Sequence, residues 1–176
     1  MKKYKYPLGI LFVFSLALLV TSQVQAASPN ALHSSVSSQR LSSAAQCQAQ
    51  GALSDPKCTP GAIFAGVTAS QVCTPGYSKS VRNVPTSVKT QVYASYGILT
   101  HAPGEYEIDH YIALELGGSN EVTNLWPEPA SPVPGFHEKD KVENYLHAQV
   151  CSGAMALDEA QHEISTNWLD VYKRIA

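Results

Sequence analysis

Residues 106–150 carry the pattern that most constrains the fold: a strand, a turn, a second strand and then a helix. Apolar and polar side chains alternate over 106–114, as they do in a half-buried strand. After a pair of glycines, 124–126 is a short return strand closed by the proline that follows. Over 137–150 the apolar residues recur at helical spacing. We therefore predict an α+β fold whose small core is a β-hairpin plus a helix.

Additional helices are expected on both sides of this core. The segment 85–96 has apolar residues four positions apart and is followed by a glycine, which predicts a helix and its end. A similar spacing predicts a last helix, capped by Asp158 and running toward Tyr172. Trp126 and Trp168 stand beside apolar residues, so we expect both in the core.

The N-terminal residues have the layout of a secretory signal peptide. Three lysines precede an apolar block over 8–20, and Ala26 stands at a suitable cleavage position. The block is shorter than the roughly 20 residues that span a bilayer, so no stable membrane anchor is expected after cleavage. We predict a signal peptide at 1–26, a flexible Ser/Ala/Gln-rich leader at 27–56 and one domain at 57–176. The chain is expected to be exported and to be periplasmic or secreted.

The sequence contains four cysteines, all of which follow the signal peptide: Cys47, Cys58, Cys73 and Cys151. An even number of cysteines in an oxidising compartment predicts two disulfides and a stapled fold. Three pairings are possible. We favour Cys73 with Cys151, because that bridge closes a long loop around the hairpin and the helix, and Cys47 with Cys58.

The charge of the predicted mature chain is unusual for a protein that binds nucleic acid. Nine lysines and arginines face 14 acidic residues after residue 26, a formal charge of −5. Phosphate contacts normally require an excess of bases. An enzyme that turns over a polymer needs a basic groove rather than a basic body, so the charge weakens a nuclease interpretation without excluding it.

Four polar residues gather in the predicted hairpin and helix without any packing reason. Asp109 and His110 lie on the first strand, Asn124 at the return strand and His137 at the start of the helix. A carboxylate and an imidazole from two elements suit a divalent cation, and a second imidazole can accept a proton from water near neutral pH. Phosphodiester hydrolysis needs these groups, although each residue alone also has an ordinary structural explanation.

Residues 107–120 (EIDHYIALELGGSN) and 124–127 (NLWP) resemble the core of His-Asn-His (HNH) endonucleases. They are most similar to small exported bacterial proteins of that superfamily, in which a helix with a Lys-Asp pair follows, here Lys139-Asp140. The resemblance implies a ββα-metal fold with one divalent ion, Mg²⁺ or another such as Mn²⁺. It also implies that Asp109 binds the metal and that His110 is the general base. Asn124 would hold the loop, and with it the His110 ring, in place, and the products would carry 5′-phosphates and 3′-hydroxyls.

The metal ligand on the helix is open between His137 and Asp140, with Glu143 as a more remote option. His137 stands 13 positions after Asn124, and Asp140 is one turn further along the same helix face. Arg82 and Lys139 are expected to bind the phosphates of the substrate. For Lys139 the alternative is an ion pair with Glu143 on a solvated helix face.

The sequence therefore predicts a metal-dependent endonuclease that hydrolyses DNA with little sequence preference, and RNA remains open as a substrate. The alternative is a non-catalytic, disulfide-stabilised binding module on the same scaffold, with the metal in a structural role.

Overall fold

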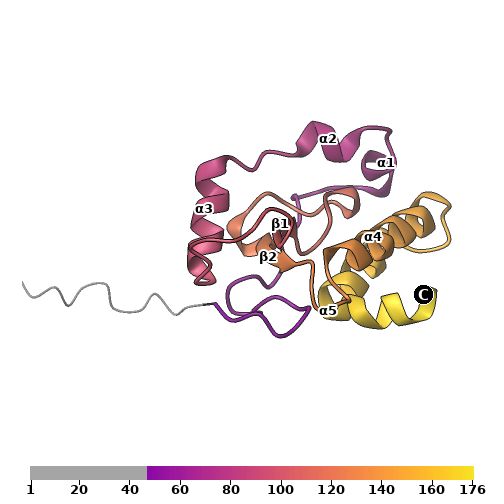
Figure 1. Cartoon of the computed structure of the whole chain (residues 1–176). Coiled ribbons are helices and arrows are strands. Elements are labelled where there is room, and N and C mark those ends of the chain that lie inside the picture. The colour runs from indigo at the N-terminus through magenta and orange to yellow at the C-terminus, as the bar shows by residue number, and fades with distance from the viewer. Residues whose placement is uncertain (1–46) are drawn as a thin grey trace, which may run out of the picture. The chain divides into compact units, whose positions relative to one another are not determined.

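A two-stranded antiparallel hairpin lies at the centre of the computed structural model, which describes residues 47–176 (Figure 1). The elements in chain order are the helices α1 (Ala69–Val72), α2 (Tyr77–Val81) and α3 (Thr86–Ser95), the strand β1 (Tyr106–His110), the 3₁₀ helices η1 (Leu114–Leu116) and η2 (Val122–Asn124), the strand β2 (Leu125–Pro129), and the helices α4 (Phe136–Cys151) and α5 (Leu157–Ile175). The predicted α+β class, with a hairpin, a following helix and additional helices, is confirmed.

The predicted signal peptide and residues 27–46 of the predicted leader lie outside the described residues. Residues 47–56, also assigned to the leader, are tied to the domain. The backbone N–H of Cys47 donates to Ser95 O at 2.9 Å, and Gln50 pairs with Leu53 in an isolated bridge. Among the described residues, no helix has both the length and the apolar character needed to cross a membrane.

The hairpin places Ile108 opposite Pro127 and Asp109 opposite Trp126. Both predicted strand ends were wrong. β1 stops at His110 instead of continuing to residue 114, because the chain turns into a tight loop that leads to η1. β2 continues through Pro127 to Pro129. Each strand of a two-stranded hairpin has a free edge, where a missing N–H breaks no ladder bond.

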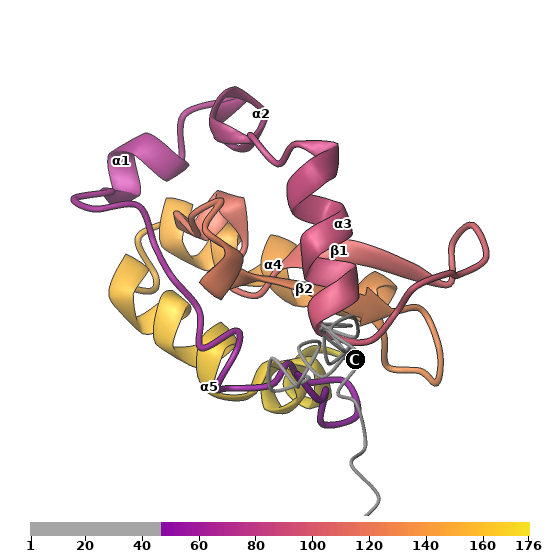
Figure 2. The ribbon, with the colours of Figure 1, turned by 90° about the vertical axis from the view of Figure 1, so that its left-hand side faces the viewer.

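The two sides of the hairpin meet different helices. α3 packs on β1 and β2 from one side, and α4 reaches β1 from the other through Lys139 (Figures 1 and 2). α3 confirms the predicted helix over 85–96, and Gly97 follows it with a φ of 73°. Glycine adopts this left-handed conformation without strain.

α4 and α5 pack against each other and supply most of the core. The buried apolar cluster consists of Val72, Ile112, Ala113, Leu116, Val142, Leu146, Val150, Ala160, Ile164, Trp168 and Val171. Trp126 and Trp168 are fully buried, as predicted. Asp158 does not cap α5, because the N-cap position is Ala156; Asp158 lies in the first turn, where a negative charge still favours the helix dipole.

Two disulfides join the segments that the sequence analysis favoured. Cys47 bonds to Cys58, and Cys73 bonds to Cys151 across 78 positions of sequence. The second bridge connects the end of α1 to the end of α4. By the chain-entropy argument, closing a loop of this length stabilises the fold by roughly 4 to 5 kcal/mol.

Candidate functional site

The loop after β1 is held by the side chain of Asn124, which is fully buried. Its Oδ1 accepts from the backbone N–H of Ile112 at 2.9 Å and of Ala62 at 3.2 Å. Its Nδ2 donates to Ile112 O at 3.0 Å and to Ser119 O at 2.9 Å. These four bonds use the full capacity of an amide side chain. Asn124 thus fixes the loop, as expected, but no hydrogen bond joins it to the His110 ring.

The same loop needs a glycine at position 118. A Cβ added to Gly118 would lie 1.7 Å from the backbone oxygen of Ile112, a distance at which the two atoms would clash. The backbone at residue 118 approaches the backbone at Ile112 closely, which explains the glycine at this position in the loop after His110.

His110 is anchored by Asn120, a residue that the sequence analysis did not assign to the site. The His110 ring is 2% exposed, and its Nε2 lies 3.1 Å from Asn120 Oδ1. The orientation of the Asn120 amide is set by its backbone partners, because Asn83 N donates to Oδ1 at 3.1 Å and Nδ2 donates to Val81 O at 2.8 Å. Nε2 of His110 therefore carries the hydrogen that it donates to Asn120.

This tautomer leaves the other ring nitrogen of His110 with a free lone pair. Nδ1 is buried and has no hydrogen-bond partner in the part of the chain that the structure describes. Burial lowers the pKa of His110, and the positive charges of Arg82 and Lys139 add to this effect, while Asn120 and Asp109 oppose it. The ring is accordingly neutral at pH 7, in the form that can accept a proton.

Arg82 lies near His110 although 28 positions separate them in the sequence. The two residues that flank Arg82 are the ones that bind Asn120, and the Arg82 charge lowers the pKa of the His110 ring. Arg82 itself is exposed. Asn120 therefore joins the proposed base and the proposed phosphate-binding residue in one arrangement.

The charges of the chain are segregated around this position. Between Asp55 and Glu105 the sequence has no acidic residue, but it has four bases, Lys57, Lys79, Arg82 and Lys89, all of them exposed. Three of them lie on or beside α2 and α3. The segment 56–104, which contains Arg82, therefore has four bases and no acid, a formal charge of +4, whereas the predicted mature chain has −5.

Asp109 contacts α4. Its Oδ2 accepts from Lys139 Nζ at 2.6 Å. The same ammonium donates to His110 O at 2.9 Å and to Glu143 Oε1. Lys139 is 1% exposed, so its three protons are satisfied entirely by protein acceptors. Burial alone would lower the Lys139 pKa, but Asp109, Glu143 and Glu128 outweigh it and raise the pKa well above its ordinary value.

Glu128 completes this buried group. It is fully buried, and neither carboxyl oxygen has a hydrogen-bond donor among the described residues. Burial and the neighbouring Asp109 carboxylate raise the pKa of Glu128 well above its usual range. Burial raises the pKa of Glu143 to about 8, while the Lys139 charge holds that of Asp109 below its ordinary value. The Lys139 ammonium and the Asp109 carboxylate form a tight ion pair beside this buried carboxyl group.

The residues expected to hold a divalent ion are not assembled for one in this arrangement. Asp109 is occupied by Lys139, whereas His137 and Asp140 are exposed on the first turns of α4. Within residues 47–176, the single group of three potential ligands close enough to share an ion does not include Asp109. Lys139, expected to meet substrate, is buried against protein acceptors instead. Lys139 binds one oxygen of Asp109, no ligand from α4 joins the other oxygen in a three-ligand group in the region that the structure describes, and the metal stays a prediction.

Comparison of the chain with protein-family models, with curated proteins and with solved structures gives no match. The candidate site consequently depends on its own geometry and on the resemblance noted in its sequence.

Sequence reasoning missed Asn120 and Glu128 for different reasons. Asn120 stands within the HNH-like segment, but its role depends on a contact with 81–83 that has no local signal. Glu128 lies opposite Glu107 in the hairpin. If the predicted return strand had been extended past Pro127, the alternation of side chains would have placed Glu107 and Glu128 on the same face of the hairpin as Asp109.

Proposed function

We propose that this protein is an exported endonuclease that hydrolyses phosphodiester bonds, with His110 as the general base. The observation that carries the proposal is the His110 ring itself: Nε2 is bound to Asn120, and Nδ1 is buried without a partner. Most buried polar side-chain atoms have a hydrogen-bond partner, so the unpaired Nδ1 supports a role in accepting a proton. The resemblance of residues 107–127 to HNH endonucleases supports the same conclusion.

The chain's own residues define one step. A water molecule attacks phosphorus, its proton passes to His110 Nδ1, and the bond from phosphorus to the leaving oxygen breaks. The leaving oxygen takes a proton from solvent, and the imidazolium then releases the proton it gained. Arg82 binds the non-bridging phosphate oxygens, because a guanidinium matches them with two parallel donors. The buried ammonium of Lys139 holds Asp109 and the end of β1 in place.

The substrate of this proposal is a polyanion lying along the basic segment. Lys79, Arg82 and Lys89 are exposed on the stretch that Asn120 connects to His110, and no acid interrupts it. These three side chains would contact phosphates, and phosphate contacts carry no information on base sequence. Cleavage therefore has little sequence preference. DNA is the proposed substrate, and RNA is a second polymer to test. Export is part of the proposal, and the two disulfides support it.

The test is degradation of supercoiled plasmid DNA by the purified, oxidised chain, with Mg²⁺ and separately with a chelator. We expect His110→Ala to lose at least a hundredfold in rate, since general bases contribute about 10² to 10⁴. His162→Ala, which alters an exposed histidine on α5, is the matched control and should keep full activity. Unchanged cleavage by His110→Ala would refute His110 as the base. The chelator arm determines whether a divalent ion takes part.

One observation favours a second candidate function, a non-catalytic binding module. Lys139 neutralises the carboxylate that HNH nucleases would use for a metal. On this alternative the basic segment binds a polyanion without turnover. DNA bound by the wild-type chain, weakened in Arg82→Ala and not cleaved under any ion condition, would select the module over the enzyme.

A further inference from the structure

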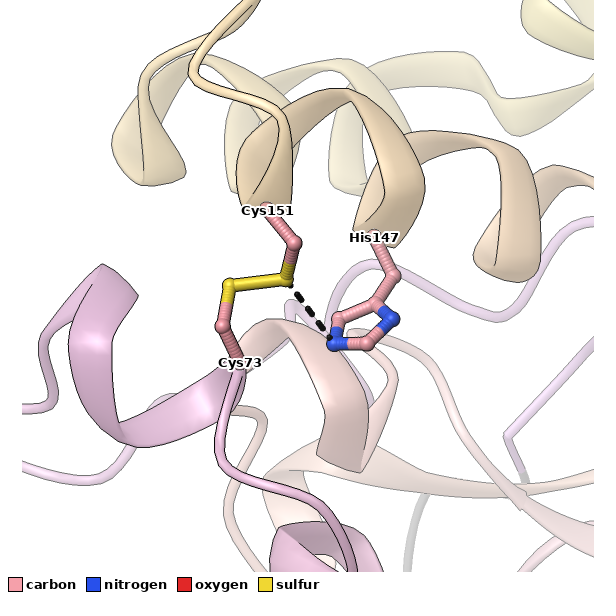
Figure 3. Close-up of side chains that lie close together, drawn as sticks. All are labelled: Cys73, His147 and Cys151. Carbon is pink, nitrogen blue, oxygen red and sulfur yellow. Dashed lines mark hydrogen bonds between the residues drawn. A yellow bond between two sulfur atoms is a disulfide. The ribbon is translucent and has the colours of Figure 1, made fainter.

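Three side chains of kinds that can bind a metal meet where α1 approaches the end of α4 (Figure 3). His147 and Cys151 lie one turn apart on α4, and Cys73 follows the last residue of α1. The ligand atoms of the three residues all lie within 4.8 Å of one another. Nε2 of His147 faces the disulfide, 3.3 Å from the sulfur of Cys151.

In the oxidised chain these residues do not hold a metal, because the sulfurs of Cys73 and Cys151 are bonded to each other. Thiolates, not disulfide sulfurs, are the ligands that bind Zn²⁺. We propose that reduction of the Cys73–Cys151 disulfide converts this place into a Zn²⁺ site formed by two thiolates and the His147 imidazole. The proposal is independent of the proposed nuclease function.

The conversion has a simple balance. A dithiol reductant transfers two electrons and two protons to the disulfide, which becomes two thiols, while the reductant becomes a disulfide. Zn²⁺ then displaces the two thiol protons. The hydrogen that His147 Nε2 donates to Val72 O moves through solvent to Nδ1, so that the Nε2 lone pair binds the metal. The resulting centre, one Zn²⁺ with two thiolates and a neutral imidazole, has no net charge, which suits a partly covered position.

The geometry requires small movements. Bonds of about 2.3 Å to sulfur and 2.0 Å to nitrogen in a tetrahedron separate nitrogen from sulfur by about 3.5 Å. His147 Nε2 is 3.3 Å from Cys151, so that pair is nearly in position. The two sulfurs must part to about 3.8 Å, which side-chain rotation can supply because the Cα atoms are 5.5 Å apart.

The surroundings also suit a cation. The carbonyl oxygen of Val72 lies 3.1 Å from His147 Nε2 and becomes free when that nitrogen binds metal. Glu115 has a buried Oε1 without a hydrogen-bond partner among the described residues, and it interacts electrostatically with His147. Water completes the coordination, since three protein ligands leave one position open. Cys151 is exposed, so a reductant can reach the bond.

The site gives the reduced chain a substitute for its longest crosslink. The disulfide joins α1 to α4 across 78 positions, and a metal held by the same residues joins the same two elements. A newly made chain in a reducing compartment would then hold this contact through Zn²⁺ until oxidation releases the ion. The Cys47–Cys58 disulfide has no such group of ligands beside it within the described part of the chain, and it serves as an internal comparison.

The experiment uses Co²⁺ as a spectroscopic probe on the full mature chain, reduced without oxygen by a phosphine. We expect one Co²⁺ per chain with thiolate-to-metal charge-transfer absorption, displacement of Co²⁺ by one Zn²⁺, and no such absorption in the oxidised chain. Cys47→Ser with Cys58→Ser is the matched control and should still bind one ion. His147→Asn should weaken Zn²⁺ binding at least tenfold, because it removes one of three ligands.

Circular dichroism of the reduced chain accompanies each titration, and Zn²⁺ should raise the Tm of the reduced wild type but not of His147→Asn. Three results would overturn the proposal: no thiolate absorption in the reduced wild type, equal Zn²⁺ affinity with and without His147, or loss of binding in the Cys47→Ser, Cys58→Ser control. If the reduced chain is unfolded and binds metal equally in all variants, the ligands are not those of this site, and the proposal fails as well.

Discussion

Replacing Lys139 by Met tests the central electrostatic feature of this fold. Methionine keeps much of the length and apolar body of the side chain but removes the ammonium that binds Asp109, His110 O and Glu143. Two carboxylates and a carbonyl then lose a shared donor in a place where Lys139 is 1% exposed. Removing one partner of a buried ion pair typically costs about 3–5 kcal/mol in the free energy of unfolding.

The expected loss depends on pH in a defined direction. Burial already raises the pKa of Glu128 and Glu143 in the native chain, and without the Lys139 charge burial should raise that of Asp109 as well, above the unfolded values near 4. Such groups favour folding while protonated and lose that contribution as the pH rises. In the wild type, by contrast, the lowered pKa of Asp109 stabilises the fold above pH 4. The difference between the two chains should be largest near pH 7 and should narrow toward pH 4–5.

Urea denaturation followed by circular dichroism at pH 7 and pH 5 measures this difference. A loss of 3–5 kcal/mol corresponds to a fall in Tm of about 10–20 °C for a domain of this size. Lys141→Met is the matched control: this lysine lies on the same helix, its side chain is 60% exposed, and its pairing with Glu138 is at the surface. We expect no measurable change there. A Lys139→Met chain as stable as the wild type at pH 7 would refute the ion-pair interpretation.

Three further predictions address the site. Asn124→Ala removes three hydrogen bonds to buried backbone groups and one to a partly buried group, and it should lower the free energy of unfolding by about 3–5 kcal/mol in urea titrations. Asn144→Ala, on an exposed part of α4, should have little effect, and equal losses in the two variants would contradict the role of Asn124 in holding the loop. Arg82→Ala should raise the KM for DNA about tenfold without changing Tm. Lys173→Ala, which alters an exposed lysine, is the control, and an unchanged KM in Arg82→Ala would show that Arg82 is not part of the site. Because burial lowers the pKa of His110, the cleavage rate should rise with pH to a plateau, with its midpoint below pH 6.5. A midpoint above pH 6.5 in the pH–rate profile would argue against a buried neutral His110 ring as the base.

Local sequence determined the elements of this protein and their apolar faces. Three local patterns carried this information: the alternation before the glycine pair, the spacing of Ala160, Ile164 and Trp168, and the glycine after residue 96. Each pattern reflects interactions within a few positions of sequence, and the structure has the hairpin and helices that they predict. Strand ends were harder. Where β1 stops depends on Asn124, 12 positions after the Ile112 backbone that it binds.

Only the tertiary structure decided which side chains share a site. Asn120 joins His110 to the segment around Arg82, 37 to 39 positions earlier, and no pattern along the chain indicates that contact. The sequence also could not determine which residue of α4 contacts Asp109. His137 and Asp140 fit the spacing, but both are exposed on α4, and Lys139 is the buried residue that binds Asp109. The rotation of a helix about its axis follows from how its whole apolar face packs, so a single polar position cannot be assigned from its own neighbours. The sequence alone therefore named Asp109 and His110 as candidates, and the packing of α4 and the loop at 81–83 determined their partners.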